Sequence, residues 1–310
     1  MSSGPGLRGC YRSAVRDQVS NAGNHRVRRR FTQRRTLLAI ALVLAPMSAC
    51  SDAGDAARTS FLPLDEGILR VATALPAPGF WDGSEPDSVD GGFEWELAQL
   101  LAERFDLELE VIAVPFAQLD AGDLGGADLA IAQITATAER DERVDFSIGY
   151  FDTAIGVLAG NGASIPDLRE ARGLRWVVVD GTTEQDFLDE VVMPSAPPLV
   201  VADETEAARA IAEGRVDAGL ADLATGLVIA GESPALEVVA QFVTRQSYAV
   251  ALPAAGATRT ANRDAVDTAL RTLTADGTLD DLAERWLEPR FERSPDGVPV
   301  IIARTPRSTP

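Results

Sequence analysis

Polar side chains that suit ligand contact follow three apolar runs of the chain, at the point where each run ends. Two of them have opposite charge: the Arg140 guanidinium can grip a carboxylate, and the Asp222 carboxylate can accept hydrogen bonds from an ammonium group. They lie in different halves of the chain, so if the halves face each other they complement a zwitterion. The runs and their polar successors are residues 128–134 with Thr135 and Arg140, Trp176–Val179 with Asp180, Thr182 and Thr183, and Ala218–Ala221 with Asp222.

The residue types on which most catalytic and metal sites depend are missing from most of the chain. The only His is His25, the cysteines are Cys10 and Cys50, and no Lys occurs at all. Downstream of residue 50 this excludes nucleophile–His pairs, zinc sites built from thiolates or imidazoles, and a P-loop or Schiff-base Lys. After residue 35 the chain has 19 Arg against 46 acidic residues, a formal charge of −27, which disfavours nucleic acid as a partner. We expect no metal and no cofactor.

The first 49 residues have the pattern of an export signal. A basic block at 26–35 precedes fourteen uncharged residues, too few to span a hydrocarbon core that needs roughly 20. Residues 47–50, Met-Ser-Ala-Cys, resemble the bacterial lipobox, whose cysteine receives a lipid; an ordinary signal peptide is the alternative. We therefore predict a lipoprotein anchored through Cys50 to the extracytoplasmic face of the cell membrane, with 50–67 as a flexible tether. Arg28–Phe31 also resembles a twin-arginine motif, so the export route stays open.

The body of the chain alternates short apolar runs with helical patterns. Residues 93–105 place apolar side chains on one helical face, and further helices are expected within Thr205–Glu213 and Ala265–Trp286. This alternation predicts an α/β fold with mainly parallel sheets. Residues 291–310 read as a loose tail, in which 298–302 could add an edge strand. Strands are expected at Leu69–Thr73, 107–111, Asp128–Ile134, Trp176–Val179, Leu199–Ala202, Ala218–Ala221 and Val238–Ala240.

Five segments, in the right order along the chain, resemble the family 3 extracellular solute-binding proteins, the polar amino-acid receptors of ABC importers. The similarity extends over residues 68–288, nearly all of the body. The segments are Gly92–Ala98, Asp128–Arg140 with Val144–Ser147, Asp180–Thr183, Gly214–Asp222, and Asp276–Leu279 with Trp286.

The resemblance implies a type II periplasmic-binding fold, in which two α/β lobes joined by two crossing strands close on a ligand. Lobe 1 would comprise 68–157 and 250–290, lobe 2 would comprise 158–249, and the crossings would lie near Ile155–Ala159 and Tyr248–Leu252. The implied function is to capture an amino acid between the lobes and deliver it to an ABC permease, as a monomer and without catalysis. A sensory module without transport and a dehydratase-type enzyme on the same fold are the alternatives.

The family positions imply a role for each polar residue. Arg140 and Thr135 would bind the ligand α-carboxylate, Thr182 or Thr183 would hold it from lobe 2, and Asp222 would accept from the α-ammonium group. Without the family spacing, Arg140 could equally form a surface ion pair within the charged stretch 139–143, and Asp222 could cap the next helix.

The resemblance leaves the ligand side chain unassigned. An aromatic residue that the family carries in the first loop is Ala77 here; Phe80 or Trp81 could replace it, or both could pack into lobe 1. Gln133 and Asp180 are further candidates for contact with the side chain. The first turn of the helix at 93–105 contains Glu94 and Glu96, where acids suit the helix dipole, and we expect neither in the pocket.

Overall fold

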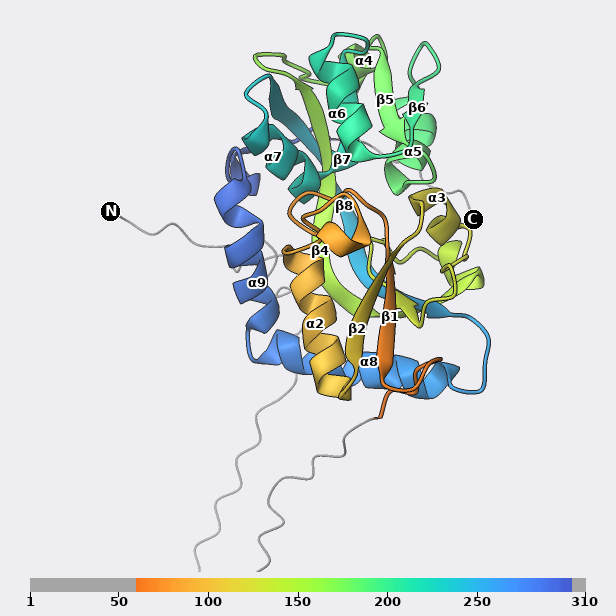
Figure 1. Cartoon of the computed structure of the whole chain (residues 1–310). Coiled ribbons are helices and arrows are strands. Elements are labelled where there is room, and N and C mark those ends of the chain that lie inside the picture. The colour runs from red at the N-terminus through yellow and green to blue at the C-terminus, as the bar shows by residue number, and fades with distance from the viewer. Residues whose placement is uncertain (1–59, 303–310) are drawn as a thin grey trace, which may run out of the picture.

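The computed structural model describes residues 60–302, which form an eight-stranded sheet in the order β2-β1-β3-β8-β4-β7-β5-β6 (Figure 1). Strand β1 pairs parallel with β2 and β3, and β5 pairs parallel with β6 and β7. The predicted α/β fold is thereby confirmed. The strands are β1 (Ile68–Thr73), β2 (Glu108–Ala113), β3 (Leu129–Ala130), β4 (Val144–Gly160), β5 (Trp176–Val179), β6 (Leu199–Val201), β7 (Ala218–Asp222) and β8 (Leu236–Pro253).

Several helices lie where the sequence predicts them. Helix α2 has the bounds that its apolar stripe indicates, and the stretch predicted at Ala265–Trp286 is two helices, α8 and α9, separated at Gly277, whose φ is +89°. The α-helices are α2 (Phe93–Phe105), α3 (Phe116–Asp120), α4 (Leu168–Ala171), α5 (Thr183–Phe187), α6 (Glu204–Ala212), α7 (Leu223–Glu232), α8 (Arg259–Ala275) and α9 (Thr278–Trp286). Short non-α turns are η2 (Pro86–Ser88), η3 (Arg140–Glu142), η4 (Leu188–Val192), η5 (Glu288–Arg290) and η6 (Pro295–Gly297).

Two long strands join the halves of the sheet. Strands β4 and β8, 17 and 18 residues long, pair antiparallel from Val144↔Pro253 to Gly160↔Leu236. We name the half with β1, β2, β3, α2, α8 and α9 lobe 1, and the half with β5, β6, β7 and α4–α6 lobe 2; Figure 1 shows lobe 2 above lobe 1. The predicted crossings fall inside these two strands, whose length the sequence pattern did not indicate. The lobe boundaries at 157/158 and 249/250 stay predictions.

An aromatic cluster forms the centre of lobe 1. The rings of Phe80, Phe93, Phe151 and Tyr248 pack with centroid separations of 5.3–6.0 Å. Gly92 begins the helix that carries Phe93, with φ +119°, and a Cβ there would lie 2.2 Å from the Phe80 carbonyl oxygen. A glycine is therefore required for α2 to start against the loop that follows β1.

The C-terminal segment 291–302 is packed against lobe 2, which corrects the prediction of a loose tail. Val298 and Ile301 are buried there, only 3% and 5% exposed. Gln241 of β8 donates from Nε2 to the Val298 carbonyl at 3.0 Å, and accepts at its own carbonyl from the Ile301 N–H at 2.8 Å. Val300 forms one parallel bridge with Gln241, so the predicted edge strand is reduced to a single pairing. Burial of Val298 and Ile301 thus docks a segment that also contains several charged and polar residues.

The export signal, Cys50 and the tether as far as residue 59 lie outside the described residues. The end of the predicted tether, 60–67, is docked: Phe61 is 4% exposed and stacks on Phe105 with the ring centroids 5.0 Å apart. Among residues 60–302, none of the helices has both the length and the apolar character needed to cross a membrane.

Candidate functional site

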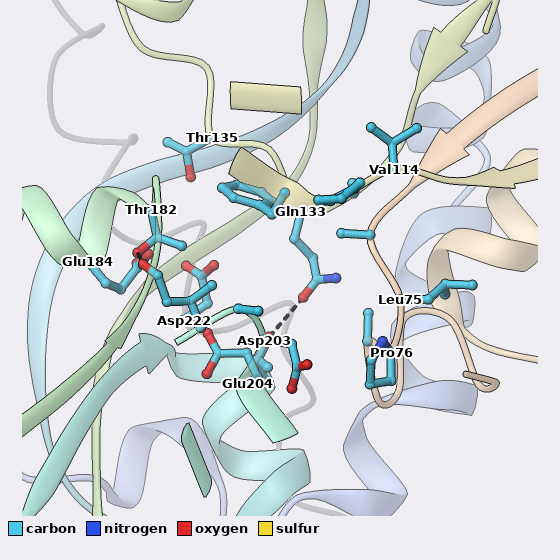
Figure 2. A pocket seen from close by; sticks show the side chains of 18 of the residues that line it. Leu75, Pro76, Val114, Gln133, Thr135, Thr182, Glu184, Asp203, Glu204 and Asp222 are labelled. Atoms are coloured by element: carbon cyan, nitrogen blue, oxygen red, sulfur yellow. Dashed lines mark hydrogen bonds between the residues drawn. The ribbon is translucent and has the colours of Figure 1, made fainter. Parts of the chain in front are cut away.

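A cavity of about 400 Å³ lies between the lobes, at the ends of strands from both (Figure 2). Lobe 1 contributes the loop after β1, the end of β2 and the residues after β3, while lobe 2 contributes the ends of β5, β6 and β7. The sequence-predicted residues Gln133, Thr135, Arg140, Thr182, Thr183 and Asp222 all line it. Polar groups at the carboxyl ends of strands thus converge on one cavity, as expected for an α/β sheet.

Arg140 is held rigidly at the wall of this cavity. It is 5% exposed, its Nε donates to Asp120 Oδ1 at 2.7 Å, and its guanidinium lies 5.5 Å from the centroid of the Phe116 ring. Its Nη1 donates to the Thr135 carbonyl at 3.0 Å, and its Nη2 donates to the Gly181 carbonyl of lobe 2 at 2.9 Å. A guanidinium has five N–H groups, so these three bonds leave two for a ligand anion.

The threonines of the site differ in how free their hydroxyls are. Thr182 caps α5, accepting from the Gln185 N–H at 3.2 Å and donating to the Val179 carbonyl at 2.9 Å. The Thr183 hydroxyl is also engaged, since it accepts from Gln246 Nε2 at 2.7 Å. A ligand contact from either residue would therefore use the backbone N–H rather than the hydroxyl. Thr135, which is 5% exposed, lines the cavity from lobe 1.

Three further carboxylates line the cavity, and the sequence analysis missed them. Asp203 and Glu204 come shortly after strand β6, and Glu184 comes after the Gly-Thr turn at the end of β5. The reasoning that found Asp222 was to inspect the polar residues at the end of each apolar run. Applied to Leu199–Val201, the same reasoning would have found Asp203 and Glu204.

The buried carboxyl groups favour their neutral forms. Burial, reinforced by the charges of Glu184 and Asp203, raises the pKa of Glu204 to about 8. Burial is also the main cause that raises the pKa of Glu184, and it raises the pKa of Asp222 well above its usual value, with the Glu184 charge acting in the same direction. A cation bound beside these carboxyl groups would favour their ionised forms and would be stabilised by them.

Gln133 links the cavity to a buried acid below it. Its backbone has φ +54°, its N–H donates to Glu94 Oε1 at 2.8 Å, and its side-chain oxygen accepts from Thr225 Oγ1 at 3.0 Å. Glu94 is 0% exposed and also accepts from Trp81 Nε1 at 2.9 Å and from the Tyr150 hydroxyl. Burial raises the pKa of Glu94 to about 7 against the opposing effect of these hydrogen bonds. Glu94 does not line the cavity, as expected, but it supports the cavity floor rather than only the helix dipole.

Three candidates for contact with the ligand side chain lie elsewhere. Phe80 and Trp81 are 0% exposed in the core of lobe 1, where Trp81 bonds to Glu94, and neither lines the cavity. Asp180 is exposed and also lies outside the cavity lining. Ala77 does line the cavity, and the aromatic residue in the lining is Phe116, which comes after β2. The loop after β1 does line the cavity, but its two aromatic side chains, Phe80 and Trp81, are packed in the core of lobe 1 instead.

Two α/β lobes joined by long crossing strands, with a cavity between them lined by a guanidinium and by carboxylates, define a protein that encloses a small solute. The chain belongs to the bacterial extracellular solute-binding proteins, family 3, whose family model matches residues 69–289. The resemblance drawn from the sequence segments is thereby confirmed. No group of three or more His, Cys, Asp or Glu side chains within residues 60–302 is placed to hold a metal ion.

Individual relatives differ in what they do. The L-cystine-binding protein TcyJ of Escherichia coli (strain K12) is 29% identical over 237 residues, which cover 72% of this chain and 86% of TcyJ. An ancestral arginine-binding protein, solved with arginine bound, superposes with a TM-score of 0.64 at 27% identity, covering 71% of this chain and 98% of that one. Membrane-bound lytic murein transglycosylase F 1 of Alkalilimnicola ehrlichii is 33% identical over 150 residues, 46% of this chain but 29% of the transglycosylase. The shared region is therefore a minor part of that longer protein.

Proposed function

We propose that the protein captures an amino acid in the cavity between its lobes and delivers it to the membrane permease of an ABC importer. The observation that carries this proposal is that Arg140 and Asp222, which come from different halves of the chain, line one cavity. A zwitterion in the cavity would have an opposite charge available at each end. The binding of amino acids by TcyJ and by the arginine-binding structure supports the same function.

Each end of the zwitterion has a defined place in this proposal. The α-carboxylate accepts from the two unused N–H groups of Arg140, together with the Thr135 hydroxyl and backbone N–H groups at Thr182 and Thr183. The α-ammonium group donates to Asp222, whose Oδ1 is buried without a hydrogen-bond partner among the described residues. A buried acceptor of this kind is costly to leave unpaired, so a ligand donor there stabilises the complex.

Contacts between the lobes would couple binding to closure. Arg140 of lobe 1 reaches the Gly181 carbonyl of lobe 2, and Gln133 of lobe 1 accepts from Thr225, which lies on α7 directly after strand β7 of lobe 2. A ligand that touches both lobes binds the closed arrangement better than the open one and so shifts the population toward it. In our proposal the permease recognises this closed form.

We further propose that Cys50 carries the lipid that holds the receptor at the extracytoplasmic face of the membrane. The support is the run of residues 36–49 followed by Cys50 in the sequence. A Cys50→Ser chain is expected to leave the membrane fraction and to lose incorporation of radiolabelled palmitate. Retention of both in the variant would contradict the anchor.

The direct test of the amino-acid proposal is a thermal-shift screen of the purified protein against the twenty amino acids, citrulline, ornithine and small dipeptides. A ligand at 100 times its dissociation constant raises the free energy of unfolding by about 2.7 kcal/mol, which moves the melting temperature by several degrees. A shift with at least one free amino acid is the expected result. A folded protein that responds to none of them contradicts the proposal.

A further inference from the structure

The side chains that line the cavity include more acidic groups than the binding of a simple zwitterion requires. Arg140 is the one cationic side chain among the described residues that line it, and it is already paired with Asp120 at 2.7 Å. Binding of an α-carboxylate and an α-ammonium group adds no net charge, so the acidic groups of lobe 2 still outnumber the cationic groups that could pair with them. The carboxylates that line the cavity are Glu184, Asp203, Glu204 and Asp222.

The four carboxylates differ in whether other groups of the protein donate hydrogen bonds to them. Asp203 caps α6 by accepting from the Glu206 N–H at 2.8 Å, and Glu184 accepts from Gln246 Nε2 at 3.1 Å. Among the described side chains, which do not include that of Arg245, none donates a hydrogen bond or an ion pair to the half-buried Glu204 carboxylate. After Asp222 has taken the α-ammonium group, Glu204 is the acid for which a donor is still missing.

Rigid elements place Glu204 and Glu184 on the same part of the cavity. Glu204 is the first residue of α6 and Glu184 lies in α5, and the two are close enough for the charge of Glu184 to make ionisation of Glu204 more costly. Figure 2 shows the four carboxylate side chains gathered on one side, with Leu75, Pro76 and Val114 on the other. The cavity thus pairs an apolar wall that can cover methylene groups with an acidic wall on which no described side chain is cationic.

We propose that the ligand is a cationic amino acid, whose side-chain guanidinium or ammonium group binds Glu204 and Glu184 while its methylene stem lies against Leu75, Pro76 and Val114. This inference rests on the proposed function and specifies its substrate class. A second positive charge supplies the donor that Glu204 lacks and favours the ionised form of its carboxyl group. A neutral or acidic side chain would leave Glu204 without a cationic partner.

The affinity for such a ligand should rise with pH. A carboxyl group must be ionised to bind a cation, and burial raises the pKa of Glu204 to about 8. Among the described residues, the charges of Glu184 and Asp203 act on it, and Asp222 and Arg140 are the other charged groups that line the same cavity. Below pH 8 the Glu204 carboxyl group has to release its proton when a cation binds, and this weakens the affinity by up to about tenfold for each pH unit. The dissociation constant of a cationic ligand is therefore expected to fall by about ten- to a hundredfold from pH 6 to pH 8.5.

The test compares ligands that differ in charge but little in shape, by titration calorimetry on the purified protein with EDTA present. Arginine and citrulline are such a pair, with lysine, ornithine and glutamine added. Arginine, lysine or ornithine is expected to bind at least a hundredfold more tightly than citrulline and glutamine at pH 8.5. Glu204→Gln, which keeps shape and removes charge, is expected to weaken the cationic ligand at least tenfold and to flatten its pH dependence.

Glu206→Gln is the matched control, because Glu206 is on the same helix and lies outside the cavity lining. It is expected to change the affinity less than twofold. Citrulline or glutamine binding as tightly as the cationic ligands would overturn the cationic class and leave the proposed amino-acid function standing. No binding of any amino acid would overturn both. Calcium or magnesium binding in place of an amino acid, in samples without EDTA, would assign the acids to a metal and overturn the inference.

Discussion

An Arg140→Ala variant is expected to bind the amino-acid ligand at least a hundredfold more weakly than the wild type, while still folding. The two N–H groups that the structure leaves free on Arg140 would both be lost. Hydrogen bonds to charged groups contribute roughly 1.5–3 kcal/mol each, so two of them amount to about 3–6 kcal/mol, or 10²–10⁴-fold in affinity. Loss of the bond to the Gly181 carbonyl, 2.9 Å long, also removes a contact between the lobes.

Two companion variants separate a ligand role from general damage. Arg140→Lys keeps the charge but not the planar fork, and is expected to recover only part of the affinity. Arg143→Ala is the control: its side chain is 35% exposed, pairs with Glu139 one helical turn away, and does not line the cavity. Titration calorimetry and circular dichroism on all three variants are the measurements. Wild-type affinity in a folded Arg140→Ala protein would contradict the carboxylate assignment.

The same pair of arginines shows what the sequence could decide. Arg140 and Arg143 stand in one charged stretch, and residue type alone makes each a candidate for a surface ion pair. The structure puts Arg143 in that pair and buries Arg140, because Asp120 and the Gly181 carbonyl, which lie 20 and 41 residues away, accept its N–H groups. Family spacing selected the arginine that lines the cavity, whereas the local pattern could not distinguish it from Arg143.

Helices and strands were predictable where the whole hydrophobic pattern of the element lies within one segment of the sequence. Helix α2 and strand β5 have the predicted bounds because a helical stripe and a continuous apolar run are complete within each. Strand β4 was not predicted over Val144–Gly160, since Asp145 interrupts its apolar pattern. Asp145 is tolerated there because Arg259 and Arg263 of α8 bind its carboxylate at 2.9 and 3.1 Å. A sequence pattern does not show partners that lie more than a hundred residues away.

Glu94 also has partners that its local sequence pattern does not show. Its position in the first turn of α2 is typical of an exposed acid that interacts with the helix dipole. The carboxylate instead points into lobe 1, because Trp81, Gln133 and Tyr150 from three other segments donate to it. The sequence could place the residue on its helix, but only the assembled core determines which way the side chain points.

Glu94→Ala is expected to lower the free energy of unfolding by about 3–5 kcal/mol. The Gln133 N–H and the Tyr150 hydroxyl would lose their acceptor inside the core, and a buried donor without a partner costs about 1–3 kcal/mol. Trp81 keeps a second acceptor, the Ile131 carbonyl at 3.1 Å, and a cavity supplies the rest of the cost. Urea unfolding of both proteins measures the difference. Glu96→Gln, in the same helical turn but bonded to Arg285 and Trp286 near the surface, is the control and is expected to cost less than about 1 kcal/mol.

A pH series distinguishes the buried carboxyl group from a simple packing effect. Since the folded protein raises the pKa of Glu94 from 4.5 to about 7, the folded state binds more protons than the unfolded state between these values. This group's contribution to stability is therefore present below pH 4.5 and decreases as the pH rises to 7. Glu94→Gln does not titrate, so the stability of the wild type relative to this variant should fall by about 1–3 kcal/mol over that range. A difference that stays constant with pH would mean that Glu94 is ionised throughout, held as a carboxylate by its three donors.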